Sequence, residues 1–333
     1  MRILIVSQDE VPRLLPMAEC MDAMAAVLRA LAEGEALLPL RTVLRLPSGG
    51  GAFAVMPAYL ATPPAIGLKA ITVFPGNEGT EYDSHQGAVL LFDTDHGRLL
   101  AIMDASSITA IRTAAVSGVA TRALAREDAG DLALLGTGVQ AMSHLEAMLL
   151  ARRIRRIRAW SRQEESVARF VARAAQRFGV AVESAVSAQD AVAGADLICT
   201  VTASRDPVLE GAWIAPGAHV NAVGSSIRTS RELDTEAMRR AALFVDRRES
   251  TLNEAGDFLV PKSEGAIGDD HIRAELGEVL LGRHGGRTSA EEVTVFKSLG
   301  LAVEDVASAH HIHEAAQRTG AGTWVELGGE RRH

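Results

Sequence analysis

The sequence predicts an α/β protein in two parts, a doubly wound Rossmann-type domain and a mixed α+β domain. The length of 333 residues is about twice the ~150 residues of a typical domain. In the middle of the chain, the apolar run Leu132-Ala133-Leu134-Leu135 is typical of a parallel strand buried on both faces, and glycines and a helical apolar pattern follow it. Strand and helix patterns then alternate, which favours a doubly wound sheet.

The expected elements divide the chain into three segments. In the first, glycine and proline turns separate short strand patterns, which indicates the mixed α+β domain. We expect this domain at residues 1–125, the Rossmann-type domain at 126–299, and a C-terminal segment, 300–333, whose helix packs back on the first domain. Strands are expected at residues 40–46, 52–56, 66–74, 88–92, 132–135, 154–160, 197–201, 219–223 and 243–245. Helices are expected at residues 16–33, 108–125, 142–150, 165–178 and 301–316.

Composition and charge exclude several classes of protein. Lys and Arg number 34 against 42 Asp and Glu, and the net charge of −8 argues against a nucleic-acid or anionic-membrane binder, which needs a basic surface. Hydrophobic residues make up 47% and charged residues 23%, as in ordinary globular proteins. No apolar run reaches the ~18 residues that span a bilayer. The N-terminus turns acidic before it could form a secretory signal, so we expect a cytoplasmic location.

Several common catalytic and metal-binding motifs are absent from the sequence. There is no GxxxxGK[ST] phosphate loop, no HExxH zinc helix and no GxSxG nucleophile elbow. The two cysteines, Cys20 and Cys199, lie far apart, so we expect neither a disulfide framework nor a CxxC pair that binds zinc. We therefore expect no metal site.

The strongest motif is the GxGxxA turn that follows the first strand of the Rossmann-type domain. Gly136 permits the tight turn, Gly138 lets backbone amides approach a pyrophosphate, and Ala141 allows the helix to pack closely on the strand. The helix N-terminus presents its partial positive charge to the phosphates. The motif predicts that Gly136, Gly138, Val139, Gln140 and Ala141 bind a nicotinamide dinucleotide, with an ordinary glycine turn as the alternative.

The end of the second strand indicates which dinucleotide binds. An acidic residue is expected ~20 residues after the turn when the cofactor is NAD, but Trp160 is followed by Ser161 and Arg162. A hydroxyl and a guanidinium suit a phosphate, so we expect NADP(H) to be preferred, with NAD(H) possible. We interpret the five neighbouring arginines, at residues 152–158, as a solvated face at a helix end and a strand start.

Five further segments carry a family resemblance over residues 39–305. Together they resemble the ornithine cyclodeaminase and mu-crystallin family, which implies an N-terminal substrate-binding and dimerisation domain, a Rossmann domain and a homodimer. The segments are Val55-Met56-Pro57-Ala58-Tyr59, Gly67-Leu68-Lys69, Arg112-Thr113-Ala114-Ala115, His219-Val220-Asn221-Ala222-Val223-Gly224 and Phe296-Lys297-Ser298-Leu299-Gly300.

The resemblance also implies the residues of the substrate site. Basic residues hold the α-carboxylate of the substrate beside the nicotinamide, and the matching positions are Arg41, Lys69 and Arg112. Independently, a lone lysine in an apolar strand pattern indicates partial burial, which would lower the pKa of Lys69 and make it a proton donor or acceptor, with a lysine on an edge strand as the alternative. The family places Ser298 and Gly300 near the nicotinamide ring.

The sequence departs from the ornithine-cyclising pattern at one position. Those members carry an aspartate just after the His-x-Asn-Ala-x-Gly strand, but this chain has Ser226, which donates or accepts a hydrogen bond and is no base near neutral pH. The serine version resembles the ketimine reductase branch. We therefore expect NAD(P)H-dependent reduction of 1-pyrroline-2-carboxylate or 1-piperideine-2-carboxylate to the L-imino acid, with Lys69 and Ser226 as the catalytic residues.

Three other functions stay open at this point. They are an ornithine cyclodeaminase that forms L-proline and ammonia, an amino-acid dehydrogenase, and a non-catalytic NADP-dependent binder of small ligands. Two further residues are left open as well. His85 lies in an expected loop and borders the pocket, caps a turn or forms a dimer contact. Asp257 lies near a strand end, where helix capping is the alternative.

Overall fold

The computed structural model describes residues 2–77 and 79–329, which form two compact units. Unit 1 comprises residues 1–112 and 301–333, and unit 2 comprises residues 113–300. The division falls inside α3 (Ala105–Leu124), whereas the sequence analysis placed it after residue 125, where this helix ends.

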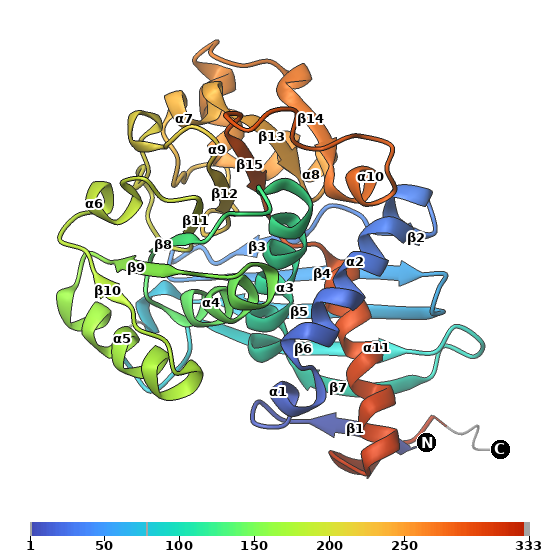
Figure 1. The fold of residues 1–333 in the computed structure, drawn as a ribbon. Helices are drawn as coiled ribbons and strands as arrows, with labels where there is room; N and C mark the ends of the chain where they lie inside the picture. Colours follow the sequence, from blue (N-terminus) through green and yellow to red (C-terminus); the bar gives the residue numbers. More distant parts are fainter. Residues whose placement is uncertain (1, 78, 330–333) are drawn as a thin grey trace. The chain divides into compact units, whose positions relative to one another are not determined.

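Unit 1 contains a mixed sheet in the order β16-β1-β7-β6-β5-β4-β2, with β3 paired to β4. The long helix α11 packs across β4, β5, β6 and β7 and lies beside α2, as Figure 1 shows. The strands are β1 (Arg2–Val6), β2 (Ala36–Leu37), β3 (Thr42–Arg45), β4 (Ala52–Leu60), β5 (Ala65–Val73), β6 (His85–Phe92), β7 (Leu99–Asp104) and β16 (Thr323–Glu326). The helices are α1 (Val11–Leu14), α2 (Met17–Glu33), α11 (Ala302–Thr319) and the 3-10 helix η1 (Pro75–Asn77).

The pattern of β5 places a lysine on the covered face of this sheet. Side chains alternate between the two faces of a strand, and Ala65, Lys69 and Ile71 are buried while Ile66 is exposed. Gly67 lies on the buried face too, and a Cβ there would meet the side chain of Val306 on α11, so the glycine permits close packing. The alternation therefore carries Lys69 toward α11.

The other face of the unit 1 sheet exposes large hydrophobic side chains. They come from neighbouring strands, because β4 pairs with β2, β3 and β5. A shallow apolar groove borders this face. The exposed residues on this face are Leu37, Leu44, Phe53, Tyr59 and Ile66.

Unit 2 is a doubly wound domain whose sheet has the order β10-β9-β8-β11-β12-β15-β13-β14, with every pair parallel. The order reverses between β8 and β11, which is where such sheets bind ligands. The strands are β8 (Asp131–Leu135), β9 (Arg156–Trp160), β10 (Glu183–Ser184), β11 (Leu197–Thr200), β12 (His219–Ala222), β13 (Ala242–Val245), β14 (Ile272–Glu275) and β15 (Thr294–Lys297). The helices are α4 (Val139–Ala151), α5 (Glu164–Phe178), α6 (Ala188–Val192), α7 (Thr235–Arg240), α8 (Arg248–Glu254), α9 (Gly256–Ser263), α10 (Leu276–Leu280), η2 (Gly211–Trp213) and η3 (Asp269–His271).

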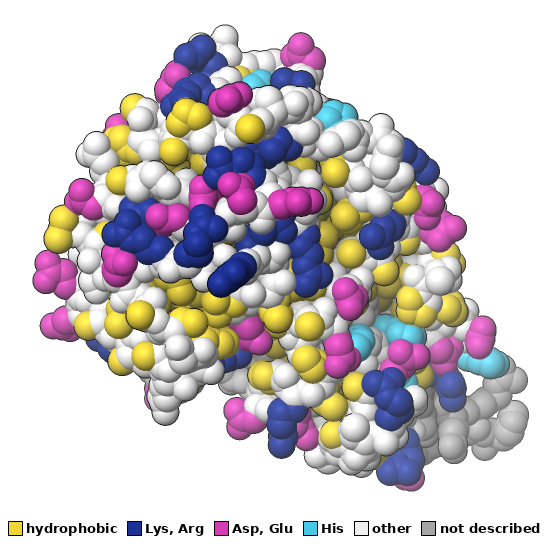
Figure 2. All heavy atoms as spheres, viewed as in Figure 1, with side chains coloured by type: hydrophobic (Ala, Val, Ile, Leu, Met, Phe, Trp, Pro, Cys, Tyr) yellow, Lys and Arg dark blue, Asp and Glu magenta, His cyan; other side chains and the backbone are white. Residues whose placement is uncertain are grey.

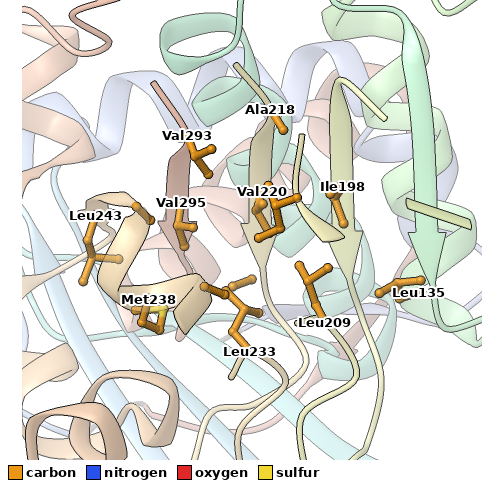
Figure 3. Packing of buried hydrophobic residues seen from close by; sticks show 14 of the residues in the cluster. Leu135, Ile198, Leu209, Ala218, Val220, Leu233, Met238, Leu243, Val293 and Val295 are labelled. Carbon is orange, nitrogen blue, oxygen red and sulfur yellow. The ribbon is translucent and has the colours of Figure 1, made fainter. Parts of the chain in front are cut away.

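Apolar side chains of the parallel strands form the core of unit 2. Figure 3 shows Ile198, Val220 and Val295 on β11, β12 and β15, together with Leu233 and Met238 from the segment that covers this face. Each of these five side chains is fully buried. The continuous apolar runs of the sequence therefore correspond to strands covered on both faces.

The predicted fold class is confirmed, with corrections at particular elements. His85 begins β6 and does not lie in the loop before it. The sequence analysis did not predict β1, β7, β15 or β16. Strands β1 and β16 pair with each other although they come from opposite ends of the chain, so no local pattern marks the pair.

The interpretation of the basic run at residues 152–158 as a solvated face is wrong for part of it. Arg158 is only 4% exposed, pairs with Asp131 at 2.6 Å and donates to the carbonyls of Asp190 and Ala193. The guanidinium of Arg152 donates to the carbonyls of Thr121 and Ala125, at the end of α3. These arginines donate to backbone carbonyls and to a carboxylate, so they bind parts of unit 2 to one another instead of facing solvent.

Charge is mixed on the molecular face that Figure 2 shows, where acidic and basic side chains alternate with apolar ones. Among the residues that the structure describes, no helix combines the length and apolar character needed to cross a bilayer. The same residues contain no group of three or more His, Cys, Asp or Glu side chains that could hold a metal ion.

Candidate active site

The predicted dinucleotide turn joins β8 to α4 at the point where the strand order reverses. Gly136 has φ +111°, and a Cβ there would lie 2.7 Å from the carbonyl oxygen of Val201, so only glycine fits. Ala141 is fully buried, which allows close packing of α4. Both observations agree with the roles that the sequence assigns to these two residues.

The first turn of α4 leaves room for an anion. Gly138 begins the helix without a side-chain cap, and a Cβ built on it would point into open space. The first amides of a helix lack partners within the helix, and the helix N-terminus attracts a phosphate, so Val139, Gln140 and Ala141 lie where a phosphate would bind. These residues fit the pyrophosphate of a dinucleotide, and their binding of one stays a prediction.

Ser161 and Arg162 follow β9, immediately before α5. Arg162 is exposed, and its guanidinium forms no hydrogen bond or ion pair with any residue in the described ranges. Glu164 and Glu165 lie in the first turn of α5, so acidic groups stand close to Arg162 in sequence. These acidic neighbours make the segment less selective for a phosphate than Arg162 alone would be.

The loops after β12 and β15 carry the other predicted cofactor-side residues. These strands are neighbours, and the amide of Ser298 donates to the carbonyl of Ala222 at 3.1 Å. Ser298 is 1% exposed, yet its hydroxyl has no hydrogen-bond partner among the described residues. A buried hydroxyl without a partner is unusual, and a ligand's polar group would satisfy it. Gly300 has φ +77° and donates its amide to Asp246.

Ser226 lies two residues after Gly224 in the loop that follows β12. It is half-buried, and its hydroxyl forms no hydrogen bond with the part of the chain that the structure describes. The hydroxyl is therefore available to a ligand as a donor or an acceptor.

Unit 1 brings two of the predicted substrate residues into one buried ionic network. Lys69 Nζ lies 2.8 Å from Asp305 Oδ2, and Arg112 Nε donates to Asp305 Oδ1 at 3.1 Å. Arg112 Nη1 also donates to Glu304 Oε2 at 2.8 Å. Lys69 and Arg112 are each 3% exposed, and both carboxylates are fully buried. We call these four residues the unit 1 network.

Burial makes Lys69 a plausible proton donor near neutral pH. The pKa of Lys69 is lowered from the ordinary 10.5 to about 8, first by desolvation and then by the charge of Arg112, whereas Asp305 opposes both effects. The charge of Arg41 also lowers this pKa, so the half-buried Arg41 acts on the same group. The structure therefore brings Lys69 and Arg112 together and places Arg41 near enough for its charge to act on Lys69, and we call these three residues the cationic site.

Sequence reasoning missed the acidic half of this network. Glu304 and Asp305 lie in the first turn of α11, and their only signal is two adjacent acids within the apolar run Leu301-Ala302-Val303 and Val306-Ala307. It also missed Lys297 and Glu232, which are fully buried in unit 2. Asp257, left open above, is fully buried and lies 2.8 Å from Lys297.

Comparison with known proteins shows which family the chain resembles over most of its length. Residues 1–320 match the model of the ornithine cyclodeaminase/mu-crystallin family. The ketimine reductase mu-crystallin of Mus musculus is 43% identical over 287 residues, which cover 85% of this chain and 86% of that protein. The Δ(1)-pyrroline-2-carboxylate reductase of Bacillus cereus strain ZK / E33L is 36% identical over 326 residues, which cover 98% of this chain and all of that protein.

Solved structures share the whole fold. The Δ(1)-pyrroline-2-carboxylate reductase of Thermococcus litoralis, in complex with NADH and L-proline, has a TM-score of 0.94 and 36% identity, covering 96% of this chain and 99% of that one. An archaeal alanine dehydrogenase dimer with bound NAD has a TM-score of 0.92 and 34% identity, covering 98% of this chain and 100% of that one.

A Rossmann-type unit with a glycine turn, joined to a mixed α+β unit with a buried cationic site, defines the class of protein. With the match over residues 1–320, the chain belongs to the ornithine cyclodeaminase/mu-crystallin family. Relatives within it include ketimine and pyrroline-2-carboxylate reductases.

Proposed function

We propose that this protein reduces a cyclic 2-ketimine carboxylate, 1-pyrroline-2-carboxylate or 1-piperideine-2-carboxylate, to the L-imino acid. The observation that carries the proposal is the cationic site of unit 1, in which a buried lysine of lowered pKa lies beside a buried arginine. Such a site suits a small substrate with one carboxylate and one basic nitrogen. The reductases among its relatives support the same reaction class.

The residues of unit 1 bind the carboxylate and supply the proton. Arg112 and Arg41 offer guanidinium donors to the carboxylate, and the Lys69 ammonium adds a third positive charge. Lys69 donates a proton to the imine nitrogen as the C=N bond becomes CH–NH, because a pKa of about 8 keeps it mostly protonated at pH 7.

The residues of unit 2 hold the cofactor and orient the reacting groups. The amides of the glycine turn would hold the pyrophosphate of the cofactor, and the hydroxyl of Ser298, which has no partner among the described residues, would hydrogen-bond to the nicotinamide. When bound, NAD(P)H supplies the hydride for C2 of the imine. Ser226 offers a hydroxyl that can donate or accept a hydrogen bond. A serine there offers no carboxylate base, which disfavours cyclisation of ornithine.

We propose NADPH as the preferred cofactor and NADH as the second. Arg162 has no partner among the described residues and suits a 2′-phosphate. Two observations oppose an exclusive preference. Glu164 and Glu165 follow closely, and the two similar solved structures hold NADH and NAD.

We propose a homodimer that forms through the exposed apolar face of the unit 1 sheet. Phe53, Tyr59 and Ile66 are 39%, 37% and 41% exposed on adjacent strands, and apolar patches of this kind mark interfaces. The alanine dehydrogenase of similar fold is a dimer. Phe53→Asp should convert the protein to a monomer in light scattering after gel filtration, and a dimeric Phe53→Asp variant would place the interface elsewhere.

The test of the proposed activity follows NADPH absorbance with freshly prepared 1-pyrroline-2-carboxylate and 1-piperideine-2-carboxylate, with NADH in parallel. Ornithine with NAD serves as the control, with ammonia as the readout. Consumption of NADPH or NADH that requires an imine supports the reductase. Ammonia from ornithine without imine reduction would establish the lyase, and melting shifts with ligands but no turnover would establish a binding protein.

A further inference from the structure

Unit 2 contains a second buried ionic network, formed by Lys297, Asp257 and Glu232. Each of the three side chains is 0% exposed. Lys297 Nζ lies 2.8 Å from Asp257 Oδ2 and donates to the carbonyl oxygen of Ser225 at 2.5 Å. The lysine at the end of β15 is thus bound to the loop that follows β12. We call these three residues the unit 2 network.

The carboxylate of Glu232 extends the network to the loop after β11. It accepts hydrogen bonds from the hydroxyl of Thr200 at 2.8 Å, from the amide and hydroxyl of Thr202 at 2.6 and 2.7 Å, and from the amide of Gly224 at 2.7 Å. Asp257 in turn accepts from the amides of Glu232 and Leu233 at 2.7 and 3.0 Å. Three buried charged groups therefore join the ends of three neighbouring parallel strands.

The joined loops carry the residues that the proposed function needs at the nicotinamide. Ser226 follows Ser225, whose carbonyl Lys297 holds, and Ser298 follows Lys297 itself. Ligands of open α/β sheets bind at the carboxyl ends of strands, where these loops lie. The network itself is fully buried, so its side chains support the loops from within the unit.

Stability alone does not account for such a network. Replacing a buried ion pair with well-packed apolar residues is often neutral or stabilising, because the desolvation of two charges offsets their attraction. The contacts here are directional, because Lys297 donates one hydrogen bond to a backbone carbonyl instead of to a second carboxylate. That arrangement fixes a peptide plane.

We propose that Lys297, Asp257 and Glu232 are positioning residues that fix the loops carrying Ser226 and Ser298. This inference rests on the proposed function for its kinetic consequence, since a displacement of about 1 Å in a reacting group costs roughly 100-fold in rate. Its structural consequence does not depend on any activity. Loss of the Lys297 ammonium frees the Ser225 carbonyl and loosens both loops.

The test compares three variants of the full-length protein. Lys297→Met removes the ammonium but keeps the chain length of the side chain, and Lys297→Met combined with Asp257→Asn also removes the charge left behind. The matched control is Arg158→Met, which also removes a buried cation that bridges a carboxylate and backbone carbonyls. Arg158 lies in β9, outside the three loops, so its loss leaves them in place.

Two measurements separate positioning from a purely structural role. Hydrogen exchange should become faster in peptides covering residues 222–233 and 296–301 of both Lys297 variants, and remain as in the wild type there in Arg158→Met. With the imine, kcat should fall about 100-fold in both Lys297 variants while the Kd for NADH stays unchanged. The double variant should regain thermal stability without regaining kcat.

Two results would overturn the inference. One is wild-type exchange rates in both loops of Lys297→Met. The other is recovery of kcat together with stability in the double variant, which would make charge compensation the whole role. If the wild-type protein reduces no imine, the proposed function fails, and the exchange data still decide whether the network holds the loops.

Discussion

The two buried ionic networks use the same chemical groups in opposite ways. In the unit 1 network, two carboxylates hold Lys69 and Arg112, and the half-buried Arg41 adds a further cation. In the unit 2 network, the single cation Lys297 meets Asp257 and a backbone carbonyl, and the donors of Thr200, Thr202 and Gly224 surround Glu232.

The balance of charge explains the difference. The unit 1 network balances two cations with two carboxylates, and the charge of Arg41 acts on the same lysine. The unit 2 network has one cation for two carboxylates, and backbone and hydroxyl donors also contact those carboxylates. Burial, followed by the charge of Asp257, raises the pKa of Glu232, as expected where acids outnumber cations. Two buried cations with Arg41 nearby suit the binding of a carboxylate, and a network whose acceptors are satisfied suits positioning.

The largest effect should follow replacement of Lys69. We expect Lys69→Met to lower kcat for imine reduction by about 100- to 10,000-fold, the usual contribution of a general acid. The variant should also lose the alkaline limb of the pH profile, which in the wild type falls above pH 8 as Lys69 loses its proton. Steady-state rates across pH 6 to 10 check both results, and a Lys69→Met enzyme with the wild-type profile would remove Lys69 from the proton transfer.

Replacement of Arg112 should lower the stability of the folded protein more than replacement of Arg41. Arg112→Ala removes one of the two cations that pair with the buried carboxylates of Glu304 and Asp305, so we expect it to cost about 3 kcal/mol of stability. We also expect it to raise KM for the imine by roughly 100-fold. Arg41→Ala should raise KM with little change in Tm, because Arg41 is only half-buried. Kinetics and thermal melts of both variants provide the check. Unchanged KM in both would refute carboxylate binding at this site.

These networks also mark the limit of prediction from sequence. The turn at Gly136 and Gly138 was predictable because strand, turn and helix are contiguous, and Lys69 stood out as a lone charge in an apolar strand pattern. Asp305 was not predictable as the partner of Arg112, since 193 residues separate them. A buried acid in a helix looks in sequence like a surface acid until the packing of that helix is known.

The same reasoning applies to unit 2. Lys297 ends a short strand in the segment Phe296-Lys297-Ser298, whose only signal in the sequence is its match to a family motif. Asp257 and Glu232 lie 25 residues apart and meet through backbone amides, a contact that no side-chain pattern encodes. The network depends on which strands become neighbours, and that order is a property of the whole sheet.

Asp305→Asn should shift the pH dependence without abolishing activity. The Asp305 carboxylate raises the pKa of Lys69, so its removal lowers a pKa that already lies near 8. The alkaline limb of the rate profile should therefore move to lower pH, by about 1 unit for an interaction of about 1.4 kcal/mol. A limb that stays in place, or moves to higher pH, would show that Asp305 does not act on the titrating group.

Stability should respond to the same group with a defined sign. The folded-state pKa of Lys69 is about 8 and its ordinary value is 10.5, so between these pH values the unfolded chain binds more protons. Stability should rise with pH across this window in the wild type, by more than in Lys69→Met. Urea unfolding at pH 8 and pH 10 measures the difference, and equal slopes would mean that Lys69 titrates alike in both states.

The smallest effect should follow replacement of Arg162. Its charge is exposed, whereas the charges of both networks are buried. Water and salt screen an exposed guanidinium, and Glu164 and Glu165 lie close to it in sequence, so its contact with a 2′-phosphate should contribute only about 1 kcal/mol. We expect Arg162→Ala to raise KM for NADPH about fivefold and to leave KM for NADH unchanged. The NADPH effect should shrink in 0.5 M salt, whereas the effect of Arg112→Ala should persist, because buried pairs are screened much less. Equal changes for both cofactors would show that Arg162 does not read the phosphate, and the cofactor preference would then depend on the hydroxyl of Ser161 or on the amides at the start of α5.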